Sequence, residues 1–318
     1  QMCIRDSGQS HQSHLQGARV HVRKPTGMTL RQGPRSRVTG GTRVCAVIGD
    51  PIAHSLSPAI HNAAFKSLGM ELVYVAFRVR AKELPAAIKG MKALGVLGIN
   101  VTMPHKSHIL PLLDRLEKHA KDIGAVNTVV SKNREYCGYN TDGEAATAAL
   151  EELGSITGRK AVLLGAGGAA SSIVYQLSMQ AGALTILNRT RSKASHLAAK
   201  ARKWGRIPVE THALTKANCR REVKRADLLI NTLPVDIFPA FGGLLTQEQL
   251  IRPDMLIMDA NYRPKTDFIA KANFTGAKAT DGLEMLVRQA ALSFKLWTGT
   301  EPPIDVMRDA AIEARAQQ

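Results

Sequence analysis

Short apolar runs and helix-like repeats alternate along residues 43–141, and they predict strands and helices by turns. Val44–Ile48 and Leu72–Val79 are largely apolar runs of strand length. Between them, apolar residues recur every four positions, as on one face of a helix that begins with Ser57 as its N-cap and ends at Gly69. The later elements are a helix at 82–94, a strand at 98–101, a further helix, a strand at 126–130 and a short return strand at 135–139. This alternation predicts an α/β unit with a mainly parallel sheet.

A second series begins after a helix that either Thr141 or Asp142 caps and that runs to Gly154. Its first strand, Lys160–Leu164, leads directly into the sequence GAGGAA. The elements that follow are helices at 169–181 and 191–203 and strands at 184–187, 228–231, 255–258 and near 278. This order predicts a doubly wound parallel sheet. Two last helices, at 283–297 and 303–315, follow the completed sheet, and we expect them to pack back onto the first unit.

The composition narrows the class of partner. The formal net charge is +17, but residues 1–43 hold eight Lys or Arg against one Asp, which accounts for about seven of the excess charges. The other basic residues are interspersed with acidic ones and form no aromatic stacking platform, so we expect an anionic small molecule and no nucleic acid. No apolar run approaches the ~20 residues of a membrane span, so no membrane partner is expected. The four Cys, at positions 3, 45, 137 and 219, are scattered, which indicates reduced thiols, a cytoplasmic location and no metal site.

Residues 1–42 show no sustained periodicity and are rich in Gln, Ser, His, Arg and Gly. We interpret them as a disordered or artefactual leader, with Met28 as an alternative start. An organellar transit peptide is a second interpretation, because the segment is rich in Arg and poor in acidic residues.

The GAGGAA sequence at residues 165–170 has the form of a dinucleotide-binding turn, since it follows a strand and precedes a helix. The first Gly permits the tight turn, the second lets the backbone approach a pyrophosphate, and Ala170 allows the helix to pack closely on the strand. The next strand ends in Asn188-Arg189-Thr190, without the acidic residue that binds the ribose of NAD, and a guanidinium suits a phosphate. NADP is therefore the predicted cofactor of a Rossmann domain. The alternatives are a purely structural turn and a solvated helix that begins with Arg189 and Arg191.

Upstream of this turn, residues 96–142 contain VLGINVTMPHK, GAVNT and GYNTDG, in which Lys106 and Asp142 stand among Asn and Thr. Hydroxyl-binding groups and a proton-transfer pair before a dinucleotide turn suggest hydride transfer on a hydroxylated small molecule. Taken singly, Lys106 would more often be a surface lysine and Asp142 a helix cap.

The motifs GDPIAHSLSPAIHNAAF, NVTMPHK, GAVNT, NTDG, GAGGAA, NRT and DGLEMLVRQA follow one another along residues 44–300. In this order they resemble those of the shikimate dehydrogenase family, which includes shikimate/quinate dehydrogenases. The resemblance implies two α/β domains with a cleft between them: a substrate domain of residues 43–145 plus 283–318, and a Rossmann NADP-binding domain of residues 146–282. It also implies the reversible, NADP-dependent reduction of 3-dehydroshikimate to shikimate, a step toward chorismate and the aromatic amino acids.

The resemblance also implies roles for single residues. Lys106 and Asp142 match the catalytic pair, and whether Lys106 accepts a proton or stabilises an alkoxide stays open. The positions that match substrate ligands are Ser55 and Ser57 for the carboxylate, with Asn100, Thr102, Lys106, Asn127, Asp142, Tyr262 and Gln289 for the rest of the substrate. The positions that match cofactor contacts are Gly165, Ala166, Gly167, Gly168, Ala169, Ala170, Asn188, Arg189, Thr190, Thr232, Leu233, Ala260 and Gly282. No metal is implied.

Three departures from the family pattern stand near the expected cofactor site. The segment TLPVDI at 232–237 lacks the usual Gly, Glu284 replaces a Gly, and Ala260-Asn261 replaces an apolar pair, so cofactor affinity is expected to differ. The alternatives that remain are an NAD-dependent quinate/shikimate dehydrogenase, a non-catalytic shikimate-binding sensor, and a module cut from a fusion with a dehydroquinate dehydratase. The sequence leaves a homodimer open.

Overall fold

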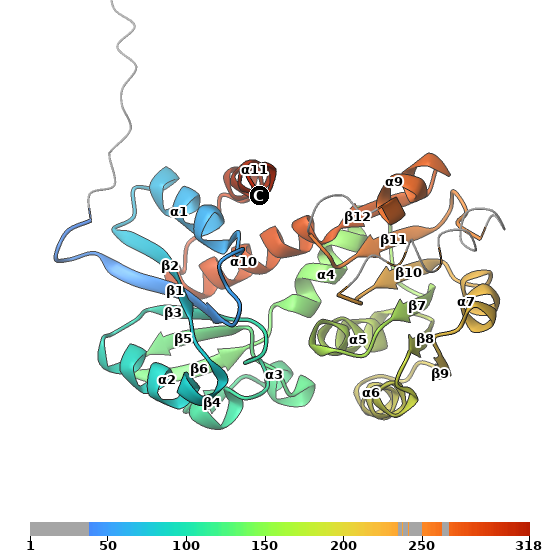
Figure 1. The fold of residues 1–318 in the computed structure, drawn as a ribbon, viewed down its shortest axis with the longest axis horizontal. Coiled ribbons are helices and arrows are strands. Elements are labelled where there is room, and N and C mark those ends of the chain that lie inside the picture. Colours follow the sequence, from blue (N-terminus) through green and yellow to red (C-terminus); the bar gives the residue numbers. More distant parts are fainter. Residues whose placement is uncertain (1–37, 235–236, 238–240, 242–249, 263–266) are drawn as a thin grey trace, which may run out of the picture. The chain divides into compact units, whose positions relative to one another are not determined.

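Two six-stranded sheets organise the chain in a computed structural model that describes residues 38–234, 237, 241, 250–262 and 267–318 (Figure 1). The interpretation of residues 1–37 as a leader lies outside the described residues, and residues 38–42 form a hydrogen-bonded turn that leads into the first strand. Within the described part, no helix combines the length and the apolar character that crossing a membrane requires.

The first sheet has the order β2-β1-β3-β5-β6-β4. Its strands are β1 (Arg43–Gly49), β2 (Leu72–Arg78), β3 (Gly98–Val101), β4 (Arg115–Leu116), β5 (Thr128–Lys132) and β6 (Glu135–Tyr139), and its helices are α1 (Ser57–Ser67), α2 (Leu84–Ala93) and α3 (Lys118–Ile123), with short 3-10 turns at Ala81–Glu83 and Leu110–Leu112. The pairs β1–β2, β1–β3 and β4–β6 are parallel, whereas β5 is antiparallel to both β3 and β6. The reversal at β5–β6 follows from its two-residue turn, in which Asn133 and Arg134 both have positive φ, as tight antiparallel hairpins require.

The second sheet has the order β12-β11-β10-β7-β8-β9, with every neighbouring pair parallel. Its elements are β7 (Lys160–Leu164), α5 (Gly168–Gln180), β8 (Ala183–Asn188), α6 (Arg191–Trp204), β9 (Val209–Ala213), α7 (Lys216–Val223), β10 (Leu228–Asn231), β11 (Leu256–Asp259), α9 (Asp267–Phe274) and β12 (Lys278–Asp281). This is the predicted doubly wound Rossmann arrangement, and its strand order reverses between β7 and β10. The two-domain α/β fold class is thereby confirmed.

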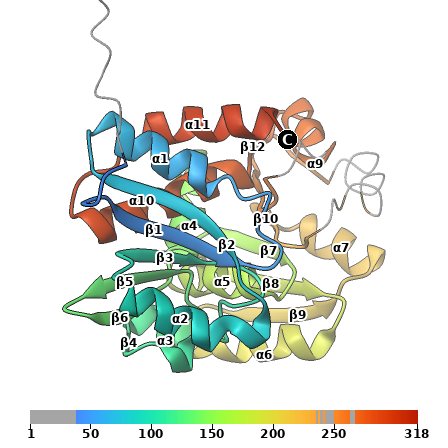
Figure 2. The same cartoon turned by 60° about the vertical axis from the view of Figure 1, so that its left-hand side comes forward.

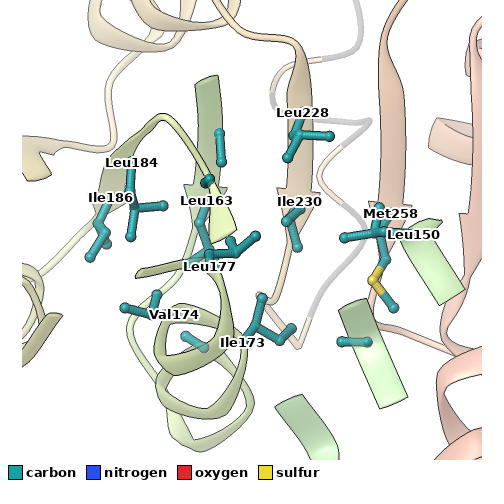
Figure 3. Close-up of a cluster of buried hydrophobic side chains, with 14 of the residues drawn as sticks. Leu150, Leu163, Ile173, Val174, Leu177, Leu184, Ile186, Leu228, Ile230 and Met258 are labelled. Carbon is teal, nitrogen blue, oxygen red and sulfur yellow. The ribbon is translucent and has the colours of Figure 1, made fainter. Parts of the chain in front are cut away.

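Apolar side chains of the second sheet and its helices form a continuous core. Figure 3 shows Ile173, Val174 and Leu177 of α5 packed against Leu163 of β7 and its neighbouring strands. Helix α4 (Asp142–Glu151), which carries Asp142 at its first turn, contributes Ala145, Ala146, Ala149 and Leu150 to the same core. The helix that follows the first sheet is therefore anchored on the second.

The last two helices, α10 (Gly282–Thr298) and α11 (Ile304–Ala316), return to the first sheet. Val287, Phe294 and Trp297 of α10 and Met307 of α11 belong to the core formed with β1 and α1. Helix α11 lies beside α1 in both views (Figures 1 and 2). The packing follows the expected return, and the domain boundaries at residues 145 and 283 stay predictions.

The N-terminus of α1 differs in one detail from the expectation. Leu56 is the N-cap and Ser57 is already helical, so Ser57 is not the capping residue. The Ser55 hydroxyl, in the loop before the helix, accepts a hydrogen bond from the backbone N–H of Ser57 at 3.3 Å. The N-cap therefore lies one residue before the predicted position, and the side chain of Leu56 makes no capping hydrogen bond.

Candidate active site

One cavity of about 300 Å³ gathers all nine residues that match substrate ligands. They come from the loop before α1, the end of β3 and the loop after it, the start of β5, the first turn of α4, the segment after β11 and the middle of α10: Ser55, Ser57, Asn100, Thr102, Lys106, Asn127, Asp142, Tyr262 and Gln289. The sequence separation of these elements is large, so the fold brings the nine together. Their individual roles stay predictions.

Lys106 and Asp142 form an ion pair in this cavity. The ammonium Nζ lies 2.5 Å from Asp142 Oδ2, and the two side chains are 25% and 7% exposed. The Lys106 carbonyl accepts a bond from the Val126 amide at 2.8 Å, which fixes the loop that carries the lysine. A charge-assisted bond between partly buried groups is among the stronger contacts in a protein, so each side chain orients the other.

Asn127 holds the other oxygen of the carboxylate. Its Nδ2 donates to Asp142 Oδ1 at 2.8 Å and to Thr141 Oγ1 at 2.9 Å, while its Oδ1 accepts from the Thr141 amide at 2.9 Å. The amide must face this way, because a carboxylate can only accept and a backbone N–H can only donate. The Asp142 side chain is thus fixed from two sides.

The substrate-binding candidates at the ends of the cavity differ in character. Ser55 and Ser57 stand at the N-terminus of the 11-residue helix α1, whose partial positive charge favours an anion. On α10, Gln289 is nearly buried and donates through Nε2 to the Leu286 carbonyl at 2.8 Å, which orients its side chain. Thr102 and Tyr262 are half-buried on the wall. A small molecule with an anionic group and several hydroxyls would match this lining.

Several wall residues were not identified from the sequence. His54 and Met103 lie within motifs already singled out, and Met285 and Leu286 stand four and three positions before Gln289, on the same face of α10. The remaining ones are Val47, Pro51, Ile52 and Val101. Helical spacing from Gln289 would have found the two α10 residues.

The glycine turn joins the nucleotide-binding sheet to this cavity. Gly165 has φ +116°, and a Cβ there would lie 2.3 Å from Thr232 Oγ1, so both conformation and space require glycine. At Gly167 and Gly168, which open the 13-residue helix α5, a Cβ would meet no protein atom within 4 Å. This open space at a helix N-terminus fits a pyrophosphate. Ala169, in the first turn of α5, also lines the cavity.

The predicted phosphate-binding residues follow β8. Asn188 is nearly buried and donates to the Thr190 carbonyl at 2.9 Å, whereas Arg189, Arg191 and Lys193 are exposed. Among the described residues, no carboxylate pairs with any of these three cations. Their charges are available to an anion from solvent, as a 2′-phosphate would require.

The departure at Ala260-Asn261 and the glycine at position 282 have structural reasons. Asn261 Nδ2 donates to the Leu233 carbonyl and to Asp259 Oδ1, both at 2.8 Å, so the amide braces the segments after β10 and β11. A Cβ on Gly282 would lie 2.3 Å from the Ala260 carbonyl oxygen, which explains why this position is glycine. Ala260 and Gly282 both line the cavity, whereas Thr232 and Leu233 do not.

Glu284 does not line the cavity, and its carboxylate faces α11. Its carboxylate accepts two bonds from the Arg308 guanidinium, at 2.9 and 3.0 Å, and lies 2.8 Å from Arg288 Nε. Arg288 also pairs with Glu152 of the residues that follow α4. The replacement of glycine by glutamate therefore adds an ion cluster between helices and leaves the cavity wall unchanged.

One group of side chains outside the cavity has the composition of a metal site. Ligand atoms of Glu210, His212 and Glu222 all lie within 4.8 Å of one another, beside β9 and α7. Arg221 already donates to Glu222 at 2.6 Å. The cluster is explained as an ion-paired surface group.

Comparison with known proteins decides the family. Residues 47–129 match the shikimate dehydrogenase substrate binding domain, residues 147–233 match shikimate/quinate 5-dehydrogenase, and residues 282–312 match the shikimate 5′-dehydrogenase C-terminal domain. The chain is 42% identical over 281 residues to the shikimate dehydrogenase (NADP(+)) of Moorella thermoacetica, across 87% of this chain and 95% of the relative. The chain belongs to the shikimate dehydrogenase family.

Two solved shikimate dehydrogenases show the same fold. One, a complex with NADP⁺, is 39% identical with a TM-score of 0.80, and the match covers 87% of this chain and 97% of the other. The other, from Listeria monocytogenes in complex with shikimate and NAD, is 35% identical with a TM-score of 0.80, over 86% and 97% of the two chains. The family resemblance of the sequence motifs is thus confirmed over nearly all of the described chain.

Proposed function

We propose that this protein is an NADP-dependent shikimate dehydrogenase, which interconverts shikimate and 3-dehydroshikimate on the route to chorismate and the aromatic amino acids. The observation that carries the proposal is the Lys106–Asp142 pair, at 2.5 Å, in a cavity whose wall also includes Ala169 of the dinucleotide turn. A polyol oxidation needs these two parts side by side, and the named relatives carry the same activity in their names.

The residues divide the work by their chemistry. Ser55 and Ser57, at the start of α1, bind the carboxylate, while Thr102, Gln289 and Tyr262 contact the ring side. Lys106 places its positive charge beside the reacting oxygen and stabilises it as the O–H proton passes to the Asp142 carboxylate, which also orients the ammonium. The dinucleotide held at the glycine turn would supply the acceptor for the hydride that leaves the carbon bearing this hydroxyl. The site roles of all these residues are part of the proposal.

The cofactor would bind across the carboxyl ends of the second sheet. The pyrophosphate would lie over Gly165, Ala166, Gly167, Gly168, Ala169 and Ala170, and the adenosine end beside Asn188, Arg189 and Thr190. The segments at Thr232, Leu233, Ala260 and Gly282 lie on the path toward the cavity. The absence of an acidic residue at the end of β8 favours NADP over NAD.

A kinetic assay with two substrates and two cofactors tests the proposal. We expect turnover with shikimate and NADP, and a lower kcat/KM with quinate or with NAD. Lys106→Ala should lower kcat by at least about 100-fold with an unchanged circular dichroism spectrum. Lys132→Ala, on the exposed end of β5, is the matched control and should behave as the wild type. Shikimate binding by calorimetry without turnover would instead indicate a sensor.

Arg189 gives an independent test of cofactor choice. Arg189→Ser should raise the KM for NADP about tenfold and leave the KM for NAD nearly unchanged, because only NADP carries the 2′-phosphate. Arg206→Ser, an exposed arginine beyond α6, controls for the loss of surface charge. Equal effects on the two cofactors would argue against a phosphate contact.

Assembly and location complete the proposal. A cytoplasmic location is part of the proposal and cell fractionation tests it, while light scattering distinguishes a monomer from a homodimer.

A further inference from the structure

Two buried hydroxyl groups stand behind the Lys106–Asp142 pair without lining the cavity. Thr128 opens β5 and Ser293 lies in the second half of α10, and both are fully buried. Their Oγ atoms are 2.8 Å apart. Neither side chain is among those that line the cavity, so neither is placed to contact a substrate.

Hydrogen bonds connect these hydroxyls to Asp142. Asn100 Nδ2 donates to Ser293 Oγ at 3.0 Å and to Thr128 Oγ1 at 3.2 Å. Thr128 Oγ1 donates to Asn127 Oδ1 at 3.0 Å, and Asn127 holds Asp142 Oδ1 at 2.8 Å. At the other end, Ser293 Oγ reaches the Gln289 carbonyl at 2.9 Å. A continuous polar chain therefore runs from α10 to the carboxylate.

The Tyr74 phenol fixes the far side of this chain. Its hydroxyl donates to Asn100 Oδ1 at 2.7 Å, so the Asn100 amide has its nitrogen toward Ser293 and Thr128 and cannot turn over without losing these bonds. In a buried site, each member that loses a partner pays the desolvation cost of an unsatisfied group. Asn100 Nδ2 also donates to the Asn127 carbonyl at 3.2 Å, so the position of Asn100 is transmitted to Asn127 through the backbone and through Thr128.

We propose that Thr128 and Ser293 are positioning residues. They act on the Asn100 and Asn127 amides, which set the orientation of Asp142, and Asp142 in turn orients Lys106. This inference rests on the proposed dehydrogenase activity. It also ties the catalytic pair to α10, the helix that places Gln289 and Met285 on the cavity wall. A displacement of α10 would then move the wall and the catalytic carboxylate together.

Steady-state kinetics of four single variants test the proposal. Ser293→Ala and Thr128→Val remove one hydroxyl each, and we expect kcat to fall about tenfold while the KM for shikimate changes by less than about twofold. Thr128→Ser keeps the hydroxyl and should restore most of the kcat. Ser178→Ala is the matched control, because Ser178 is another fully buried serine that donates to a helix carbonyl, of Tyr175 at 2.7 Å, in the other sheet unit.

The double variant Thr128→Val/Ser293→Ala supplies the decisive comparison. If both hydroxyls act through one chain, its kcat should match that of the worse single variant and not the product of the two effects. Equal kcat for Ser293→Ala and Ser178→Ala, or no difference between Thr128→Ser and Thr128→Val, would overturn the inference. If Ser293→Ala does not fold, the comparison of kcat between Thr128→Ser and Thr128→Val still tests the inference.

A readout without turnover separates this inference from the proposed function. Labelling of Lys106 by an amine-reactive ester, followed by peptide mass spectrometry, should be faster in Ser293→Ala than in Ser178→Ala, because the ion pair with Asp142 is looser. Absent shikimate turnover by the wild type contradicts the proposed function alone, whereas equal labelling rates contradict the positioning role alone.

Discussion

The ion cluster around Glu284 allows a quantitative prediction for the substitution Glu284→Gln. The side chains of Glu284, Arg288 and Arg308 are 16%, 16% and 29% exposed, so solvent screens their attraction only in part. Glutamine keeps the shape but removes the charge, and hydrogen bonds to charged groups contribute about 1.5–3 kcal/mol each in such settings. Since Arg308 keeps Asp305 as a partner and Arg288 keeps Glu152, we expect a net loss of about 2 kcal/mol.

The pH dependence of this loss identifies its cause. Burial acts to raise the pKa of Glu284, but the Arg308 and Arg288 guanidinium groups outweigh it and hold the pKa below its ordinary value. A carboxyl with a depressed folded-state pKa stabilises the fold above its unfolded pKa of about 4.3 and loses that stabilisation as the pH falls through the folded value. The difference between wild type and variant should thus be full at pH 7 and should close below about pH 4.

Thermal unfolding by calorimetry is the assay. A loss of about 2 kcal/mol corresponds to a decrease in Tm of roughly 4–8 °C for a protein of this size. Glu313→Gln, an exposed glutamate on α11, is the control and should change stability by less than about 0.5 kcal/mol. Equal Tm values for the two variants, or a Glu284→Gln difference that stays constant from pH 7 to pH 3, would refute the reasoning.

Three further predictions concern the cavity wall and the core. Gly282→Ala should cost about 1–3 kcal/mol in urea unfolding and lower kcat/KM, since the new Cβ would lie 2.3 Å from the Ala260 carbonyl oxygen; wild-type values for both would contradict the backbone contact. Burial lowers the pKa of His61 to about 3, so its ring resonances should stay constant in NMR spectra from pH 8 to pH 5, where a free histidine titrates. Burial likewise raises the pKa of the Cys45 thiol to about 12, so Ellman's reagent at pH 8 should label Cys45 in urea but not in the native protein.

The sequence predicts the central strands of the second sheet most directly, because their side chains are buried on both faces. The strand predicted at 160–164 has the same bounds as β7, because a central parallel strand is apolar along nearly its whole length. β9 and α7 were not predicted, since the edge strand VETHA and the helix KANCRREV are largely polar and carry no strong period. The Glu284–Arg308 contact could not be predicted either. The two residues lie 24 positions apart on different helices, and no sequence pattern links them.

The candidate site was predicted by position but not by orientation. The motifs located the nine residues that line the cavity, yet a sequence does not say whether an amide faces a ligand or the protein. Asn100 illustrates the difference, since its amide bonds to Tyr74, Thr128 and Ser293 within the core while the residue still borders the cavity. The sequence gives no signal for Ser293, because one serine on an apolar helix face has no distinguishing pattern.

The hydrogen-bonding capacity of Asn127 bears on how the substrate is recognised. A carboxamide offers two donors and two acceptor lone pairs. Its donors bind Thr141 and Asp142, and its oxygen accepts from the Thr141 amide and from Thr128, so all four positions are in use. A substrate hydroxyl could bond to Asn127 only by displacing one of these partners, at the cost of leaving a buried group unsatisfied.

Lys106 and Asp142, by contrast, retain capacity. The ammonium has three donors, one of which is directed at Asp142, and the carboxylate has about four acceptor positions, two of which are filled by Lys106 and Asn127. A hydroxyl that donates to Asp142 and accepts from Lys106 would complete the pair without breaking any bond of the polar chain behind it. Recognition of the reacting hydroxyl and its chemical activation would then fall to the same two side chains, and the asparagines would act by keeping these side chains in place.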